Sequence, residues 1–372
     1  SSLPAEQIDI QIPGAGISLN SIIQYVKRWR GHEPIHVIGE ITQFGTATSQ
    51  LIKVSVRIKG KPDKTFPGKI LSLKSRLRSA AKHAYLYIKP IVLAGYLAQD
   101  EKNDVECVEV IRDIISQETY ADQHYYAYAL WGYVLHRQEN YDEAFEKYEY
   151  AINTAKKDKQ KLALAYNNQA CILTAQGEYG MAIEQYQKAI SYTPKNARVY
   201  VNYGSALAKQ GKTDEAIDAY QKAIEVCQEA VEINQKDVQA YQYQGIALGY
   251  LEKPDEAIKA YQKAVGINPK DGYSYRLWGW LLANQGKLDD AIKVFKKPIE
   301  MNPKDGNAYQ GLGYALEAQH KPDKAIKIYQ KVVEMNPKDV YSYIRWGCLL
   351  EYQKKLDEAI EVYQKGVELN QK

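Results

Sequence analysis

The chain has 372 residues, of which 45% are hydrophobic and 25% charged, and its formal net charge at pH 7 is +4. This composition supplies ample material for a long core. No run of about 18 uncharged apolar residues occurs, which excludes a predicted membrane-spanning helix in this segment. The four cysteines, Cys107, Cys171, Cys227 and Cys348, are far apart in predicted helices. We therefore expect reduced thiols and a cytoplasmic location. Because the sequence begins Ser-Ser-Leu-Pro, the interpretation leaves open a missing segment that tethers the protein to a membrane.

The first part of the chain is strongly basic. Residues 1–90 hold 14 Lys and Arg against five Asp and Glu, a net charge of +9, whereas the remainder is net acidic. Residue alternation and turn signals predict a small basic α+β domain over residues 1–87 with the order β-α-β-β-α. The expected elements are a strand at Ile8–Ile12, a helix at Leu19–Trp29, a hairpin formed by His36–Phe44 and Leu51–Lys59, and a helix from about Lys69.

The basic residues of this domain are a candidate binding patch. They are Lys27, Arg28, Arg30, Lys53, Arg57, Lys74, Arg76 and Arg78. Such a patch would attract nucleic acid or an anionic membrane surface through charge, with the rest of the chain as a spacer. A solvated basic face explains the same residues equally well, since few aromatic residues are interleaved with the charges, with Trp29 and Phe66 as the main candidates.

Residues 88–124 are expected to form a degenerate helix pair. Apolar and small residues recur at helical spacing in both halves of this segment, at Ile91, Ala94 and Ala98 and again at Cys107, Ile111 and Ile114. The pair would connect the small domain directly to the remainder of the chain.

From Tyr125 to Lys372 a unit of about 34 residues occurs seven times, a period that is typical of a solenoid. Every unit has tyrosine in fourth place, glycine or alanine in eighth, leucine in eleventh and an aromatic residue in twenty-fourth. Apolar spacings of three and four predict two amphipathic helices per unit, which bury their apolar faces only by stacking on neighbouring units. The units start at Tyr125, Ala163, Ala197, Val238, Gly272, Gly306 and Val340.

These shared places resemble the tetratricopeptide repeat (TPR) family over residues 125–372. The resemblance implies a mainly α protein, a right-handed α-solenoid of seven clear helix pairs plus the degenerate one, preceded by the small domain. It also implies a non-enzymatic scaffold or adaptor that holds a peptide segment or a protein surface in a concave groove. The N-terminal region is similar to the leading region of some bacterial TPR proteins of unassigned role, which implies a bacterial source.

Three local features of the repeats lead to further expectations. The aspartates that begin the shared motif, Asp142, Asp214, Asp255, Asp289, Asp323 and Asp357, are expected to cap the second helices. Seven extra residues between Ala223 and Gln235 are expected to lengthen one second helix by about two turns. The last unit has no polar helix after it, so Val362, Val367 and Leu369 are expected to be partly exposed. Either the natural chain continues, or this end docks onto another molecule, self-association included.

The partner-binding residues are predicted from the resemblance. In the family, places two, five, six, nine, twelve and thirteen of the first helix line the groove, and here they hold aromatic, arginine and amide side chains. These are residue types that anchor protein partners, whereas a merely solvated face would carry more Lys and Glu. The candidates are Tyr126, Tyr133, Asn167, Asn168, Arg198, Asn202, Tyr243, Tyr250, Tyr273, Arg276, Trp280, Tyr314, Tyr341 and Arg345.

The sequence also indicates what is not bound. Arg198 and Asn202 match only part of the residue set with which the chaperone-binding members of the family grip a terminal carboxylate, so an internal segment or folded surface is expected. No cofactor or metal is expected, because the six histidines are scattered without ligand spacing. No nucleophile motif of the Gly-x-Ser-x-Gly type occurs. We therefore predict no catalytic residues.

Overall fold

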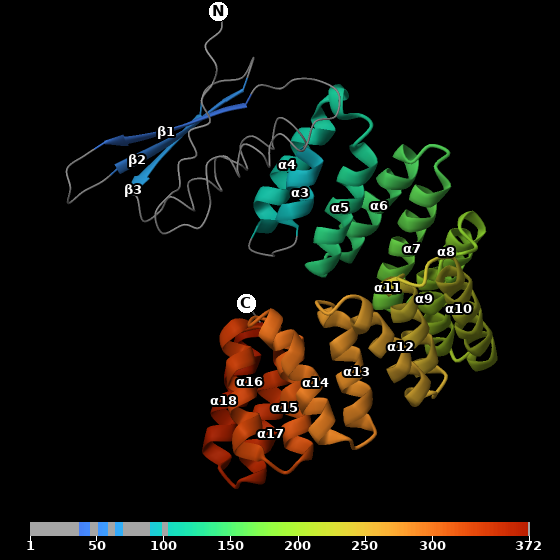
Figure 1. The fold of residues 1–372 in the computed structure, drawn as a ribbon, viewed down its shortest axis with the longest axis vertical. Helices are drawn as coiled ribbons and strands as arrows, with labels where there is room; N and C mark the ends of the chain where they lie inside the picture. The colour runs from blue at the N-terminus through green and yellow to red at the C-terminus, as the bar shows by residue number, and fades with distance from the viewer. Residues whose placement is uncertain (1–36, 45–50, 59–63, 70–89, 99–102, 371–372) are drawn as a thin grey trace, which may run out of the picture. The chain divides into compact units, whose positions relative to one another are not determined.

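The computed structural model describes residues 37–44, 51–58, 64–69, 90–98 and 103–370 (Figure 1). The chain divides into two compact units, residues 1–156 and residues 157–372, and each is described by itself. Within the described ranges there are three strands and sixteen α-helices, so the protein is mainly α.

The strands form one antiparallel sheet in the first unit. The order is β1 (Val37–Phe44), β2 (Leu51–Ile58) and β3 (Lys64–Lys69). β1 pairs with β2 from Val37 opposite Ile58 to Phe44 opposite Leu51, which confirms the predicted hairpin. The predicted strand at residues 8–12 and both predicted helices lie outside the described residues.

The third strand, β3, corrects the predicted order β-α-β-β-α. β3 was missed because it contains Pro67 and Gly68 and shows no apolar alternation. A proline has no backbone donor, but β3 is an edge of the described sheet, where a proline is tolerated.

Four helices complete the described part of the first unit: α3 (Pro90–Leu97), α4 (Asp104–Ser116), α5 (His124–Arg137) and α6 (Tyr141–Thr154), with a short 3-10 turn at Glu118–Tyr120. The segment interpreted as a degenerate pair thus contains two helices. Leu97, Ile111 and Ile114 are fully buried in one cluster that also includes Val134 of α5. Burial raises the pKa of the Cys107 thiol in this cluster to about 11.

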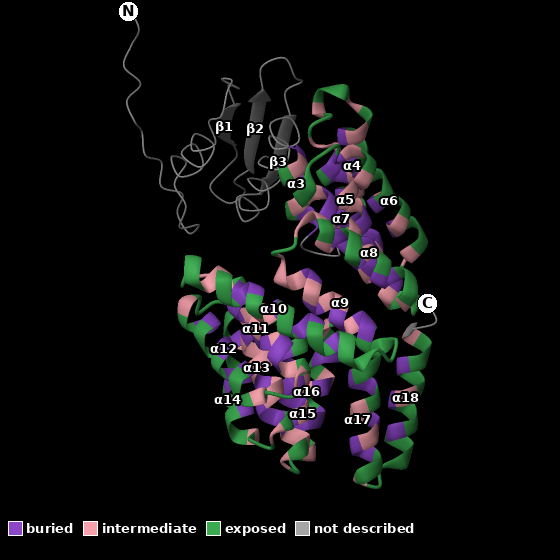
Figure 2. Ribbon diagram, turned by 90° about the vertical axis from the view of Figure 1, so that its right-hand side faces the viewer, coloured by how far each residue is buried: buried purple, intermediate pink, exposed green. Residues whose placement is uncertain are grey.

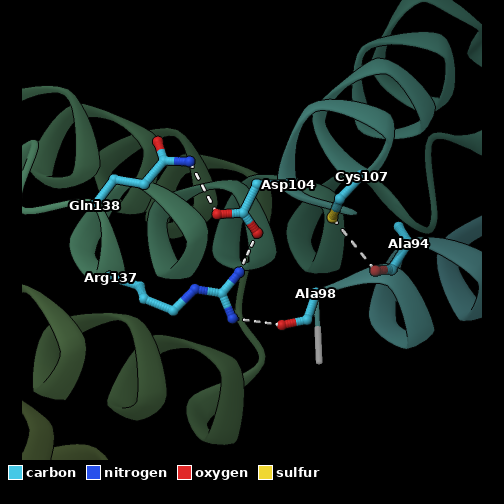
Figure 3. A network of polar contacts seen from close by, with 6 residues as sticks. All are labelled: Ala94, Ala98, Asp104, Cys107, Arg137 and Gln138. Atoms are coloured by element: carbon cyan, nitrogen blue, oxygen red, sulfur yellow. Dashed lines mark hydrogen bonds and ion pairs between the residues drawn. The ribbon is translucent and has the colours of Figure 1, made fainter. Parts of the chain in front are cut away.

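A polar network joins the ends of three of these helices (Figure 3). Arg137 near the end of α5 pairs with Asp104 at the start of α4 and donates from Nη1 to the carbonyl oxygen of Ala98 at 2.7 Å. Gln138 donates from Nε2 to the other carboxylate oxygen of Asp104 at 2.9 Å. These contacts satisfy a carbonyl at the end of α3 and attach α3 and α4 to α5.

The second unit consists of six consecutive helix pairs. The first helices are α7 (Lys159–Gln176), α9 (Ala197–Lys209), α11 (Val238–Tyr250), α13 (Gly272–Asn284), α15 (Gly306–Ala318) and α17 (Val340–Tyr352). The second helices are α8 (Tyr179–Tyr192), α10 (Thr213–Ile233), α12 (Pro254–Ile267), α14 (Leu288–Met301), α16 (Pro322–Met335) and α18 (Leu356–Asn370). α10 has 21 residues where α12, α14 and α16 have 14, which confirms the predicted extension.

The recurring spacing of small and aromatic residues in the repeats is explained by close packing between the two helices of a pair. A Cβ atom added at Gly245 would lie 2.6 Å from the ring of Tyr261, and one at Gly313 would lie 2.8 Å from the ring of Tyr329. Real carbon atoms do not approach so closely, so glycine at place eight admits the aromatic ring at place twenty-four. Figure 2 shows the buried residues on the sides where the helices face one another.

The turn between the two helices of a pair has the same backbone in all seven repeats. Place fifteen has a positive φ in every unit, at Glu139, Gly177, Gly211, Glu252, Gly286, His320 and Lys354. A left-handed residue at this place ends the first helix and reverses the chain. Three units use glycine, for which this conformation carries no steric cost.

The prediction that aspartates cap the second helices was wrong. α12 has Lys253 at its N-cap and begins with Pro254, so Asp255 lies inside the first turn, where its charge still favours the helix dipole. The side-chain caps belong to first helices instead. Asp237 accepts from the backbone N–H of Ala240 at 3.0 Å, and Asp271, Asp305 and Asp339 cap α13, α15 and α17 in the same way.

The exposure of α18 agrees only in part with expectation. Val367 is 57% exposed and Leu369 is half-buried, but Val362 is only 7% exposed because it packs against α16 and α17. Self-association through this helix stays a prediction.

Candidate partner-binding face of the first helices

The first helices of the second unit form a layer of their own. α7 packs on α9, α9 on α11 and α13 on α15, while each second helix from α8 to α16 packs on the first helices before and after it, and α18 packs on α17. We call the solvent side of this layer, which carries places two, six, nine and thirteen, the first-helix face. Twelve of the fourteen predicted partner-binding residues lie on these six helices.

The other two predicted residues, Tyr126 and Tyr133, lie on α5 in the first unit. Both are about half exposed. Tyr126 makes an edge contact with the ring of Tyr125, and the guanidinium of Arg137 lies 5.5 Å from the ring centre of Tyr133. Because the two units are described separately, these residues are not assigned to the first-helix face.

Two of the predicted arginines are engaged inside the chain. Arg276 donates from Nη1 to Asp305 at 2.6 Å, and Arg345 forms a two-pronged pair with Glu317. Glu317 also accepts from the hydroxyl of Tyr329 at 3.3 Å. Arg276 therefore links α13 to the cap of α15, and Arg345 links α17 to α15.

These links belong to two regular ladders of hydrogen bonds. In the first, place five of one unit donates to the capping aspartate of the next, as in Gln242 to Asp271 and Gln310 to Asp339, both at 2.8 Å. In the second, a glutamine at place fourteen donates to the aspartate at place eighteen of the preceding unit. Its three members are Gln285 to Asp255, Gln319 to Asp289 and Gln353 to Asp323, at 3.0, 2.7 and 2.8 Å. Three of the six aspartates first interpreted as caps, Asp255, Asp289 and Asp323, thus join neighbouring units.

The predicted asparagines form one cluster between α7 and α9. Asn202 donates from Nδ2 to Oδ1 of Asn167 at 3.1 Å and also approaches Sγ of Cys171 at 3.6 Å. Asn167 is only 2% exposed and donates in turn to Oδ1 of Asn168 at 3.2 Å. Asn167 therefore orients its neighbours and does not itself face a partner. Asn168 and Asn202 remain partly exposed.

Arg198 lies one helical turn before Asn202 on α9, so both side chains are on the same side of the helix. The guanidinium also lies beside the hydroxyl of Tyr243 on α11: burial raises the pKa of Tyr243, and Arg198 acts in the opposite direction. Within the ranges that the structure describes, Arg198 has no carboxylate within ion-pair distance, unlike Arg276 and Arg345.

The predicted aromatic side chains follow along α11 to α17. Tyr250 is 54% exposed and stacks on Tyr220 with ring centres 4.7 Å apart, and Tyr273 is 45% exposed. The ring centre of Trp280 lies 5.1 Å from that of Tyr314 on the next first helix, α15. Tyr341 is also exposed, and burial raises its pKa while Arg345 lowers it. The predicted aromatic residues thus lie on four successive first helices, α11, α13, α15 and α17.

One feature was missed by the sequence interpretation. A shallow cavity of about 540 Å³ lies beside the end of the lengthened helix α10, lined by Val231, Glu232, Gln235, Tyr241, Lys263 and Ile267. Next to it, Ile233 is 87% exposed. The signal for it was the seven-residue extension, which carries α10 beyond the length of the other second helices.

The basic patch lies largely outside the described residues. Only Lys53 and Arg57 fall on a described element, β2. In the part of the chain that the structure covers, no three His, Cys, Asp or Glu side chains gather as a metal-ligand group. The same residues include no helix long and apolar enough to cross a bilayer.

Stacked helix pairs with these fixed contacts define an α-solenoid, and the sequence comparisons identify its family. Profiles described as tetratricopeptide repeat match residues 196–270 and, separately, 244–306, 276–340 and 311–372, and one described as TPR repeat matches residues 171–211. Together they span more than half of the chain. The chain belongs to the tetratricopeptide repeat family, whose members generally mediate protein–protein interactions and are typically non-enzymatic.

Several solved structures are similar to this chain. A tetratricopeptide repeat protein from Parabacteroides merdae ATCC 43184 is 19% identical with a TM-score of 0.49, over 73% of this chain and 99% of that one. MamA, residues 41 to the end, from Desulfovibrio magneticus RS-1 is 22% identical with a TM-score of 0.38, over 47% and 95%. YrrB, described as a TPR protein with an unusual peptide-binding site, is 25% identical with a TM-score of 0.33, over 57% and 100%. A search of curated proteins found no match.

Proposed function

We propose that this protein is a non-enzymatic scaffold that holds a peptide segment or a protein surface on the first-helix face of residues 157–372. The observation that carries the proposal is the exposure of large aromatic side chains on that face. Tyr250 and Tyr273 are about half exposed, whereas Tyr261 and Tyr329 at place twenty-four are buried between helices. Packing within the array explains the burial of Tyr261 and Tyr329. It leaves much of the side chains of Tyr250 and Tyr273 exposed to solvent.

The chemistry of this face supports binding to a polypeptide. Tyrosine and tryptophan offer a large contact area at a low cost in side-chain entropy, which is why they dominate protein interfaces. Asn168 and Asn202 add amide groups, which can donate to and accept from a peptide backbone. Because successive first helices carry these residues, a bound segment would cross several helices of the layer.

The proposal is tested with a library of random 15-residue peptides displayed on phage and selected on the full chain. We expect selected peptides to lose at least about ten-fold in affinity for the double variant Tyr250→Ala, Tyr273→Ala, because each truncation removes aromatic contact area. Binding is measured with the synthetic peptides by fluorescence polarisation.

A matched control removes exposed apolar side chains from second helices. The double variant Ile217→Ala, Met301→Ala changes α10 and α14, where both residues are exposed, and it should bind the selected peptides like the wild type. Equal losses in the two double variants, or no loss in the tyrosine variant, would contradict binding on the first-helix face. Thermal unfolding shows that both variants are folded.

A further inference from the structure

Arginine is distributed unevenly in the repeats. All four arginines after Tyr125, namely Arg137, Arg198, Arg276 and Arg345, lie on first helices, while the second helices use lysine as their cation. Three of the four have a carboxylate partner in the described chain: Asp104 for Arg137, Asp305 for Arg276 and Glu317 for Arg345. Within the same described ranges Arg198 has none, which makes it the exception.

The surroundings of Arg198 supply no negative charge. The side chain is half-buried on α9, with the amide of Asn202 one turn away and the hydroxyl of Tyr243 beside it. Both neighbours are neutral, and Asn202 already donates to Asn167. A partly desolvated guanidinium without a counter-ion can still form charge-assisted hydrogen bonds with an anion.

Contact residues lie on both sides of this position along the layer. Asn168 lies on α7, before α9, and Tyr243, Tyr250 and Tyr273 lie on α11 and α13, after it. A segment that reaches both groups passes over Arg198 in its interior and not at its end. The anion at Arg198 would then be a side chain of the segment.

We propose that Arg198 selects an aspartate or glutamate side chain inside the bound segment. The planar guanidinium presents paired donors that match the two oxygens of a carboxylate. Asn202, whose Oδ1 has no partner among the described residues, and Asn168 lie close enough along the layer to bind the backbone beside that acidic residue. This inference rests on the proposed function and adds a sequence preference to it.

The test uses the same random library on the full chain and three variants. Arg198→Glu reverses the charge, Arg198→Gln removes it at similar size, and Lys296→Glu reverses an exposed charge on the second helix α14, away from the first-helix face, as a control. We expect the wild type and Lys296→Glu to select peptides with one shared Asp or Glu position. Arg198→Gln should lose this preference, and Arg198→Glu should select Lys or Arg there.

A synthetic peptide then separates the two sources of a carboxylate. With its C-terminus amidated, the selected peptide should retain its affinity, whereas replacing its acidic residue by the amide analogue should weaken binding about ten-fold, as for the loss of one charge-assisted contact. Loss of binding on amidation would assign Arg198 to a terminal carboxylate and overturn the proposal.

The remaining outcomes distinguish this inference from the proposed function. Peptides that depend on Tyr250 and Tyr273 but share no acidic position would overturn the role of Arg198 and leave the scaffold function standing. If no selected peptide depends on Tyr250 and Tyr273, both fail together. Thermal unfolding of each Arg198 variant shows whether a changed selection reflects a folded protein.

Discussion

Two stretches of the second unit use their polar side chains differently. In the regular stretch, residues 238–372, both hydrogen-bond ladders run from unit to unit and the arginines are paired. In the irregular stretch, residues 163–237, Val201 stands at place five, and Gln210 at place fourteen faces Gly180 where the regular units have aspartate. The ladder contacts are therefore missing there.

The difference shows where polar side chains are not needed for the contacts between units. Where the repeat is regular, arginine and glutamine on the first helices stabilise the contact between units. Where it is irregular, Asn202 links α9 to Asn167 of α7, but Arg198 has no carboxylate partner among the described residues and remains available to a partner. The irregular stretch also contains the extension of α10.

The strongest test of this difference between the two stretches is to replace an arginine by alanine in each of them. Arg345→Ala should lower the free energy of unfolding by about 1–2 kcal/mol, because Glu317 is mostly buried and would lose its charged donor. Arg198→Ala should change it by no more than about 0.5 kcal/mol, since no described carboxylate depends on it. Urea unfolding followed by circular dichroism measures both.

The order of these two effects decides the result. If Arg198→Ala destabilised the protein as much as Arg345→Ala, Arg198 would be a structural residue, and the contrast between the stretches would be lost. Glu317→Gln provides a control, because it keeps a hydrogen-bond acceptor for Arg345 and should cost less than Arg345→Ala.

Much of this fold follows from the repeat, because each fixed place has a packing role. Gly245 and Tyr261 could be paired from the sequence, since only a small residue admits the ring. The engagement of Arg276 was missed, although its signal was present: Gln242 and Asp271, Arg276 and Asp305, and Gln310 and Asp339 are all 29 residues apart. β3 gave no signal, because Pro67 and Gly68 interrupt any strand pattern. That Arg198 has no carboxylate partner among the described residues is a property of the folded surroundings, which a single unit does not encode.

A second prediction installs the missing ladder contact in the irregular stretch. Gly180→Asp should raise the free energy of unfolding by about 1 kcal/mol. Gly180 lies in the first turn of α8, near the side-chain amide of Gln210, so the new carboxylate would gain a donor and favour the helix dipole. The change in urea midpoint measures the gain.

Gly180→Ala isolates the part of the gain that comes from helix propensity alone. The reverse change in the regular stretch, Gln319→Ala, should cost about 0.5 kcal/mol, because it removes the exposed hydrogen bond to Asp289. If Gly180→Asp gained no more than Gly180→Ala, the ladder would contribute nothing to the contact between units.

The smallest expected effect concerns the extension of α10, which contains Cys227. Burial, assisted by Asp237, raises the pKa of this thiol from 9.0 to about 12. As the pH rises above 9 the unfolded chain loses the proton first, so the stability contributed by the buried thiol is present below pH 9 and is lost as the pH approaches 12.

Cys227→Ala should lower the free energy of unfolding at pH 8, since it leaves a small cavity. Between pH 8 and pH 10.5, however, the variant should lose less of its free energy of unfolding than the wild type does. Urea midpoints at the two pH values give this difference directly and cancel the titration of the tyrosines, which both proteins share. Equal losses in the wild type and the variant would mean that the extension opens at alkaline pH before the rest of the array unfolds.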